Sequence, residues 1–115
     1  MEQRIFKVSD FEKEDKDLAV KTIIQSSESS NTVVWVVKPG QSVKCHMHDN
    51  ADDIWYVLEG TGLFHCEVGK NVEVKQGDVI INKKGQCHGV TNNGNTDFKF
   101  LGVLTSSPAN YEALE

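Results

Sequence analysis

Turn-forming residues interrupt the chain at short, regular intervals, and this rhythm restricts the fold more than any other feature of the sequence. Between the turns lie short runs rich in Val, Ile, Phe, Trp and Tyr, which favour extended strands. The turn sequences are Pro39-Gly40, Asp49-Asn50, Glu59-Gly60, Gly69-Lys70, Gln76-Gly77-Asp78, Lys84-Gly85 and Asn92-Asn93-Gly94-Asn95. Strands that recur about every 8–12 residues, without a long segment of helical periodicity, predict an all-β sandwich or barrel with little helix.

The same pattern divides the chain into three predicted parts. Residues 1–17 are rich in charge and lack an apolar stripe, so we expect an N-terminal arm with at most one helical turn. Residues 18–107 hold the strands of the barrel and begin with a hairpin from Leu18 to Lys38. Residues 108–115 form a C-terminal tail. The full length of 115 residues suits a single domain.

Charge, hydropathy and cysteine content exclude several classes of protein. Twelve basic residues against seventeen acidic ones give a net charge of −5, so the chain lacks the basic patch that would bind nucleic acid. No apolar run is long enough to cross a membrane, and no secretory signal is visible, so we expect a cytoplasmic protein. The three cysteines are widely spaced and contain no C-x-x-C pair, which favours reduced thiols over a disulfide framework.

Three histidines form a pattern that suggests a metal site. His46 and His48 are two residues apart, so on a strand their imidazoles point to the same face. A short acidic loop follows, and an antiparallel strand that begins at Asp53 would bring a carboxylate beside them. Such a group binds divalent iron, manganese, nickel, zinc or copper. His88 stands near the start of another short strand, but its spacing alone does not show that it joins the group.

The positions of glycines, histidines and one acidic residue resemble the two sequence motifs of the cupin superfamily. These motifs are G-x5-H-x-H-x3,4-E-x6-G and G-x5-P-x-G-x2-H-x3-N. The matching positions are Gly40, His46, His48, Asp53 and Gly60 in the first motif and Gly77, Gly85, His88 and Asn92 in the second. Asp53 stands where the family has Glu, and Lys83 where it has Pro. The resemblance implies a double-stranded β-helix, or jelly-roll barrel, with one divalent metal inside. The ligands that it implies are His46, His48, Asp53 and His88.

The short side chain of Asp53 leaves several ways to complete such a site. On an unchanged backbone its carboxylate falls about 1–1.5 Å short of the position that Glu would reach. The strand could shift inward, water could complete a site of three histidines, or Asp52 or Asp49 could replace Asp53. The spacing to Gly60 favours Asp53. In a metal-free alternative, the histidines are hydrogen-bonded groups of an ordinary core.

Four aromatic residues are candidates for a substrate-binding pocket. Trp55 shares the face of Asp53 by strand alternation, and Trp35 lies in the strand before the first motif. Phe98 and Phe100 share one face of a late strand. Packing in the core is the alternative for all four residues. The sequence identifies no catalytic residue.

The cupin resemblance leaves the function open between two classes. A small metalloenzyme, such as a dioxygenase, an isomerase or cyclase, or a lyase, would use the metal on a small polar organic substrate. A non-catalytic module would bind or sense a sugar or an organic acid in the same pocket. Both hypotheses predict a small-molecule ligand. We also expect a homodimer, formed through the outward face of Ile54, Tyr56 and Leu58 or through N-terminal strands.

Overall fold

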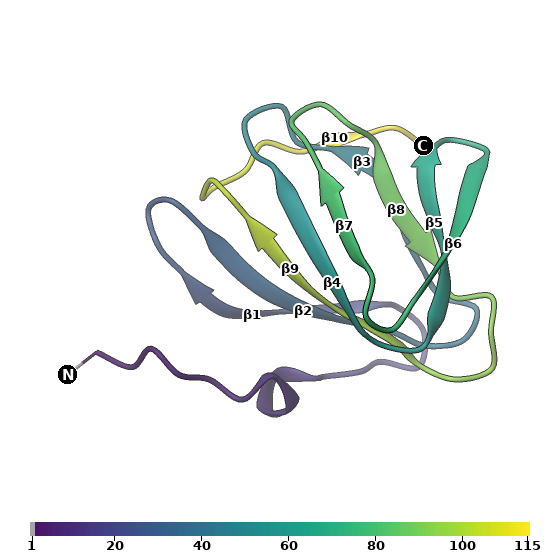
Figure 1. The fold of residues 1–115 in the computed structure, drawn as a ribbon, viewed down its shortest axis with the longest axis horizontal. Coiled ribbons are helices and arrows are strands. Elements are labelled where there is room, and N and C mark those ends of the chain that lie inside the picture. Colours follow the sequence, from purple (N-terminus) through teal and green to yellow (C-terminus); the bar gives the residue numbers. More distant parts are fainter. Residues whose placement is uncertain (1) are drawn as a thin grey trace.

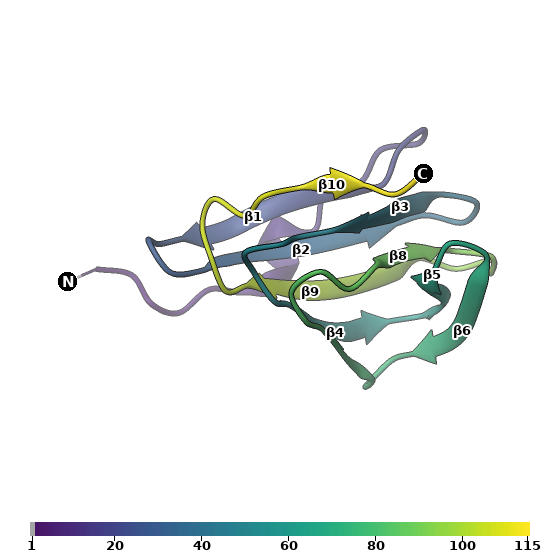
Figure 2. The same cartoon turned by 90° about the horizontal axis from the view of Figure 1, so that it is seen from above.

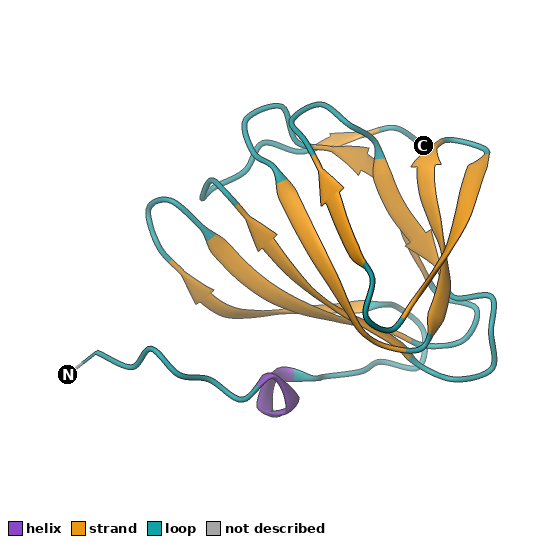
Figure 3. Cartoon of the chain, viewed as in Figure 1, coloured by secondary structure: helices purple, strands orange, loops and turns teal. Residues whose placement is uncertain are grey.

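The computed structural model describes residues 2–115, which form ten β-strands and one 3₁₀ helix (Figures 1 and 3). The elements are η1 (Val8–Phe11), β1 (Val20–Ser26), β2 (Asn31–Val37), β3 (Ser42–Met47), β4 (Asp53–Glu59), β5 (Thr61–Glu67), β6 (Lys70–Lys75), β7 (Val79–Asn82), β8 (His88–Thr91), β9 (Phe98–Leu104) and β10 (Glu112–Ala113). Gly60 joins β4 to β5 with a φ of 84°, a conformation that favours glycine. Among the described residues, no helix is long and apolar enough to cross a membrane.

The strands form two five-stranded antiparallel sheets. The first sheet has the order β1-β2-β9-β4-β7, and the second has the order β10-β3-β8-β5-β6 (Figures 1 and 2). Strands that are distant in sequence lie side by side, as β2 and β9 do, because the chain passes repeatedly from one sheet to the other. This arrangement confirms the predicted all-β, double-stranded β-helix fold with little helix.

The hydrophobic core lies between the two sheets, where inward residues alternate with outward ones. Phe98 and Phe100 of β9 are fully buried, and the ring of Phe100 lies 4.1 Å from that of Trp55 in β4 between centroids. The next inward position of β9 is Gly102, which fills no space. A Cβ at Gly102 would lie 3.5 Å from Oδ1 of Asp53. The aromatic core therefore ends at Gly102, beside the first residue of the candidate site.

Both terminal segments contact the barrel. Ion pairs from Lys38 to Glu14 (3.0 Å) and from Lys99 to Glu12 (3.2 Å) attach the N-terminal arm. The C-terminal segment contributes β10, which pairs with β3 (Figure 2). The stretch expected to be a tail thus contains a short strand of the second sheet. The division of the chain after residues 17 and 107 stays a prediction.

Candidate metal centre

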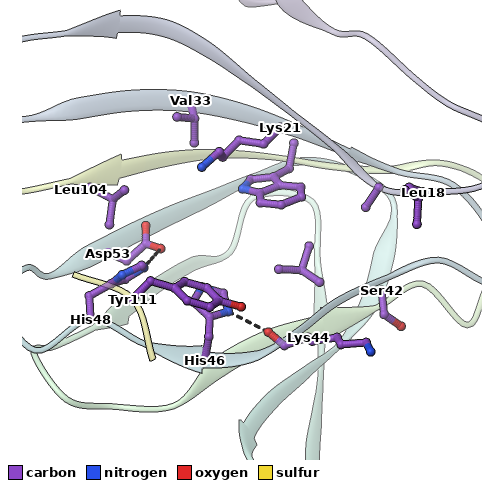
Figure 4. A pocket seen from close by; sticks show the side chains of 13 residues that line it. Leu18, Lys21, Val33, Ser42, Lys44, His46, His48, Asp53, Leu104 and Tyr111 are labelled. Atoms are coloured by element: carbon purple, nitrogen blue, oxygen red, sulfur yellow. Dashed lines mark hydrogen bonds and ion pairs between the residues drawn. The ribbon is translucent and has the colours of Figure 1, made fainter. Parts of the chain in front are cut away.

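Four potential metal ligands come together between the sheets. His46 lies in β3, His48 follows the end of β3, and Asp53 and His88 begin β4 and β8. The ligand atoms that these residues offer lie within 4.8 Å of one another, and all four residues are buried. Figure 4 shows His46, His48 and Asp53 gathered at one side of a cavity. The fold therefore brings His88 into the group, which sequence spacing alone left open.

A shift in strand register places His46 opposite His88. The pairing of β3 with β8 is irregular between Val43 and His46, after which His46 pairs directly with His88. Gly89 allows the two backbones to approach each other, because a Cβ there would lie 2.7 Å from the carbonyl oxygen of Val43 and 2.9 Å from the nitrogen of Cys45. A larger residue at position 89 would separate the strands that hold the two imidazoles.

Each imidazole of the group is oriented by a hydrogen bond between its Nδ1 and a backbone carbonyl. The pairs are His46 with Lys44 (2.7 Å), His48 with Asn110 (2.7 Å) and His88 with Gln86 (3.1 Å). A carbonyl only accepts, so Nδ1–H donates and the lone pair of each neutral ring lies on Nε2. All three Nε2 atoms are thus available to one ion, as in known histidine metal sites.

The carboxylate of Asp53 faces these nitrogens. Its Oδ2 lies 3.1 Å from Nε2 of His88 and 3.7 Å from Nε2 of His48. Burial would raise the pKa of Asp53, but the facing imidazoles of His48 and His88 outweigh burial and lower this pKa to about 2. Burial lowers the pKa of His46 to about 4. The group therefore combines an ionised carboxylate with a neutral imidazole, which are the protonation states that metal binding requires.

A cavity of about 370 Å³ adjoins the group, and His46, His48 and Asp53 form part of its wall. Lys21 of β1 and Tyr111 of the C-terminal segment line it from opposite sides (Figure 4). The amine of Lys21 makes no ion pair or hydrogen bond with any side chain in residues 2–115. A small molecule in this cavity would touch the candidate ligands and a free cation together.

Comparison with known proteins decides the family. A family model described as a cupin domain matches residues 33–104. This chain is a cupin. The oxalate-binding protein of Thermotoga maritima is 46% identical to this cupin over 66 residues, which are 57% of this chain and 54% of that protein. The cupin spans about half the length of the curated relatives that it matches.

Two solved structures resemble this cupin over most of its length. A Klebsiella pneumoniae protein with a double-stranded β-helix domain has 32% sequence identity and a TM-score of 0.94, and the match covers 99% of both chains. A predicted oxalate decarboxylase from Thermotoga maritima has 33% identity and a TM-score of 0.70 over 76% of this chain and 80% of that chain. These matches confirm the family that the motif spacing indicated.

The donor set of this cupin fits a divalent transition metal. Nε2 of His88 is buried and, among residues 2–115, has no hydrogen-bond partner, although Oδ2 of Asp53 lies 3.1 Å away. Such an unpaired polar atom costs about 1–3 kcal/mol, a cost that coordination to an ion would remove. Three imidazoles and a carboxylate suit iron, manganese, nickel, zinc or copper. The cluster is therefore compatible with metal binding.

Among the acidic residues of the loop before β4, Asp53 is the one that faces the histidines. Asp49 accepts a hydrogen bond from the side-chain amide of Asn110 (2.8 Å), and Asp52 accepts one from the backbone N–H of Lys84 (3.1 Å). Neither belongs to the group of ligand atoms, which contains Asp53. The structure thus gives no support to replacement by Asp52 or Asp49. Direct ligation by Asp53 stays a proposal.

Of the four aromatic candidates, one lines the cavity and three lie in the hydrophobic core. Trp35 lines the cavity, whereas Trp55, Phe98 and Phe100 do not line it and belong to the hydrophobic core. Trp55 packs edge-on against His88, with ring centroids 5.6 Å apart, and so supports the cluster from behind. The contacts of Trp55, Phe98 and Phe100 are packing contacts. Substrate binding by Trp35 stays a proposal.

Sequence reasoning did not find Lys21, Asn110 or Tyr111. All three lie outside residues 33–104, to which the cupin match is confined. Lys21 occupies an ordinary position on an alternating strand, and the segment with Asn110 and Tyr111 has no apolar pattern. An aromatic residue in an otherwise polar tail was the one signal that could have pointed to Tyr111.

Proposed function

We propose that this cupin binds one divalent metal and, through it, a small carboxylic acid. The ligands in this proposal are His46, His48, Asp53 and His88. The observation that carries it is the buried, unpaired Nε2 of His88, grouped with three other ligand atoms beside a cavity. A metal bound there would supply Lewis acidity and open coordination positions for an oxygen ligand.

Size and charge favour a small acid as the ligand. A cavity of about 370 Å³ is near the lower end of the range for ligand pockets, about 300–1,000 Å³. A divalent ion balanced by one carboxylate keeps a positive charge, and Lys21 adds another within a chain of net charge −5. The relative named an oxalate-binding protein and the structure named a predicted oxalate decarboxylase support oxalate as the first acid to test.

Apolar and charged residues of the cavity wall have different roles in recognition of the acid. Val33, Trp35 and Leu104 provide apolar surface that excludes water from the ligand atoms. Lys21 attracts the acid and contacts the end that is turned away from the metal ligands. Burial and the nearby charge of Lys21 act to lower the pKa of His48, but the carboxylate of Asp53 and the carbonyl of Asn110 outweigh them and raise this pKa above its ordinary value.

Turnover of the bound acid is a second candidate function, which one observation favours. The phenol of Tyr111 lines the same cavity as His46 and His48 and could exchange a proton with a bound molecule. Dioxygenase, isomerase or cyclase, and lyase chemistry are the reaction classes to examine. Binding without turnover needs no such proton donor, so it is the simpler proposal.

Elemental analysis and calorimetry test the proposal together. The purified protein should carry a stoichiometric amount of one divalent metal, and the His46→Ala, His48→Ala double variant should carry none. Oxalate should bind to the metal-loaded wild type and not to the metal-free protein. Equal metal content in wild type and variant would contradict the proposal. Mass analysis of the incubated oxalate separates the two candidates, because binding alone leaves the compound unchanged.

The homodimer and the cytoplasmic location stay predictions. Ile54 and Tyr56 of β4 face outward and pair with Ile81 and Val79 of the edge strand β7. All four side chains are exposed and form an apolar outer face. Light scattering should show a dimer at micromolar concentration, and a monomer there would count against the prediction.

A further inference from the structure

One of the three clustered histidines depends on a distant part of the chain for its orientation. His46 and His88 each direct Nδ1 to a carbonyl two residues before them. His48 lies beyond the end of β3, and its Nδ1 donates to the carbonyl of Asn110, 62 residues further along the chain (2.7 Å). Strand pairing therefore does not fix the ring of His48, whereas the C-terminal segment, residues 107–115, does.

The loop that follows His48 holds Asn110 in place. The backbone N–H of Asn110 donates to Oδ1 of Asn50 (2.7 Å), and its side-chain amide donates to Oδ1 of Asp49 (2.8 Å). Asn50 in turn donates to the carbonyl of Pro108 (3.3 Å). The loop after His48 and the C-terminal segment thus each donate hydrogen bonds to the other. The carbonyl of Asn110, which orients His48, lies within this network.

The rest of the C-terminal segment lies along β3 and over the cluster. Ala113 pairs with His46, and the ring of Tyr111 stacks on that of His46 with centroids 5.0 Å apart and an angle of 23° (Figures 2 and 4). Residues 110–115 are nevertheless exposed, and β10 contains only two residues. A segment with so few buried contacts opens more readily than the strands of the core.

We propose that the C-terminal segment is a positioning element of the metal centre, with Asn110 as the positioning residue for His48. When the segment is docked, Nε2 of His48 points toward the other ligand atoms. When it is released, the His48 ring loses its orienting carbonyl and turns freely. The inference rests on the proposed function, because it concerns the same four ligands.

This coupling acts in both directions. A metal that binds more tightly to the docked form must stabilise docking by the same free energy, since linkage between two equilibria is reciprocal. The C-terminal segment lies outside residues 33–104, so the coupling adds to what the cupin domain itself provides. Metal binding should therefore order the segment, and release of the segment should weaken metal binding.

The Asn50→Ala variant of the 115-residue chain tests whether loosening of the segment weakens metal binding, because the substitution removes the oxygen that accepts from the backbone N–H of Asn110 and leaves His48 intact. Loss of the outer hydrogen-bond partner of a metal ligand costs about 10–100-fold in affinity, so Zn²⁺ titration should show a weakening in that range. Asn50→Asp keeps the acceptor oxygen and should restore much of the affinity. Asn93→Ala, in the exposed loop between β8 and β9, is the matched control and should bind Zn²⁺ like wild type.

Hydrogen–deuterium exchange of the wild type tests the other direction and needs no variant. Saturating Zn²⁺ should slow exchange in residues 107–115, where the N–H of Leu114 donates to the carbonyl of Cys45 (3.0 Å). Unchanged exchange in this segment, or equal Zn²⁺ affinity for wild type and a folded Asn50→Ala, overturns this inference alone. If the wild type binds no Zn²⁺ at all, the proposed function and this inference fall together.

Discussion

The inner and outer ends of the cavity differ in how their residues are held. At the inner end, His46 and Asp53 are buried, lie in paired strands and belong to residues 33–104. At the outer end, Lys21 and Tyr111 are exposed and come from segments on either side of that range. The candidate metal cluster thus lies within the range that the cupin model matches, whereas Lys21 and Tyr111, which line the cavity beside it, lie in flanking segments.

This difference has a physical reason. Metal ligands must be placed to about 0.2 Å, which requires strands, buried packing and oriented imidazoles. A cavity mouth must admit and release a ligand, which requires exposure and mobile side chains. Changes at the inner end should therefore alter metal affinity, and changes to Lys21 should alter the affinity for the acid while the metal stays bound.

The largest effect is expected from His88→Ala. The substitution removes one coordinating nitrogen, so metal affinity should fall by more than the roughly 100-fold limit for loss of an outer hydrogen-bond partner. Titration of metal-free protein with Zn²⁺ measures the change. His65→Ala is the matched control, because His65 lies in β5, outside the cluster, and contacts Thr91 (2.7 Å). Comparable losses for His65→Ala and His88→Ala would show that the cluster is not the binding site.

Gly89→Ala should separate β3 from β8 without removing a ligand. The added Cβ meets backbone atoms of Val43 and Cys45, which cannot move aside as side chains do. We expect a loss of about 1–3 kcal/mol in the free energy of unfolding, together with weaker metal binding. Urea unfolding and Zn²⁺ titration measure the two effects. Gly94→Ala is the control, because a Cβ there meets only Oδ1 of Asn92, at 3.4 Å. An unchanged Zn²⁺ affinity in Gly89→Ala would contradict the role assigned to the register.

The sequence predicts the inner end of the cavity much better than the outer end. His46 and His48 share a face by strand alternation, and the motif spacing adds Asp53 and His88, so local pattern and family resemblance together find the cluster. The contact between His48 and Asn110 joins residues 62 positions apart, and the only strand in the described segment around Asn110 has two residues, Glu112 and Ala113. A strand that short has no periodicity to detect.

The position of Lys21 at the cavity could not be predicted from the sequence either. Its exposed position on β1 reads as an ordinary surface lysine, because nothing in the neighbouring residues shows which sheet it will face. Only the folded structure shows that it lines the same cavity as His46, His48 and Asp53 (Figure 4). Fold class and the four clustered residues can therefore be predicted from strand rhythm and family resemblance, whereas the cavity positions of Lys21 and Tyr111 depend on the three-dimensional closure of the barrel.

Lys21→Met should lower the affinity for the acid and leave metal binding unchanged. A hydrogen bond to a charged group contributes about 1.5–3 kcal/mol, and because Lys21 is exposed we expect the lower end, a loss of about tenfold in oxalate affinity. Calorimetry on metal-loaded protein measures it, and elemental analysis should show unchanged metal content. Lys75→Met, on β6 of the other sheet, is the matched control for loss of one positive charge. Equal oxalate affinities for the two variants would remove Lys21 from the ligand site.

The smallest expected effect is that of Trp35→Phe, and comparison with Phe98→Leu distinguishes an aromatic residue of the cavity from one of the core. Trp35→Phe trims the apolar wall and should weaken oxalate binding about 2–5-fold, which corresponds to about 0.5–1 kcal/mol of lost apolar contact. Its effect on unfolding should be small, because Phe preserves a stack on Phe100, whose ring lies 6.0 Å from that of Trp35. Phe98→Leu, in the fully buried core, should instead lower the free energy of unfolding by about 1–2 kcal/mol and leave oxalate affinity unchanged. Calorimetry and urea unfolding on both variants give the four values. If both substitutions change oxalate affinity alike, Trp35 makes no specific contact with the bound acid.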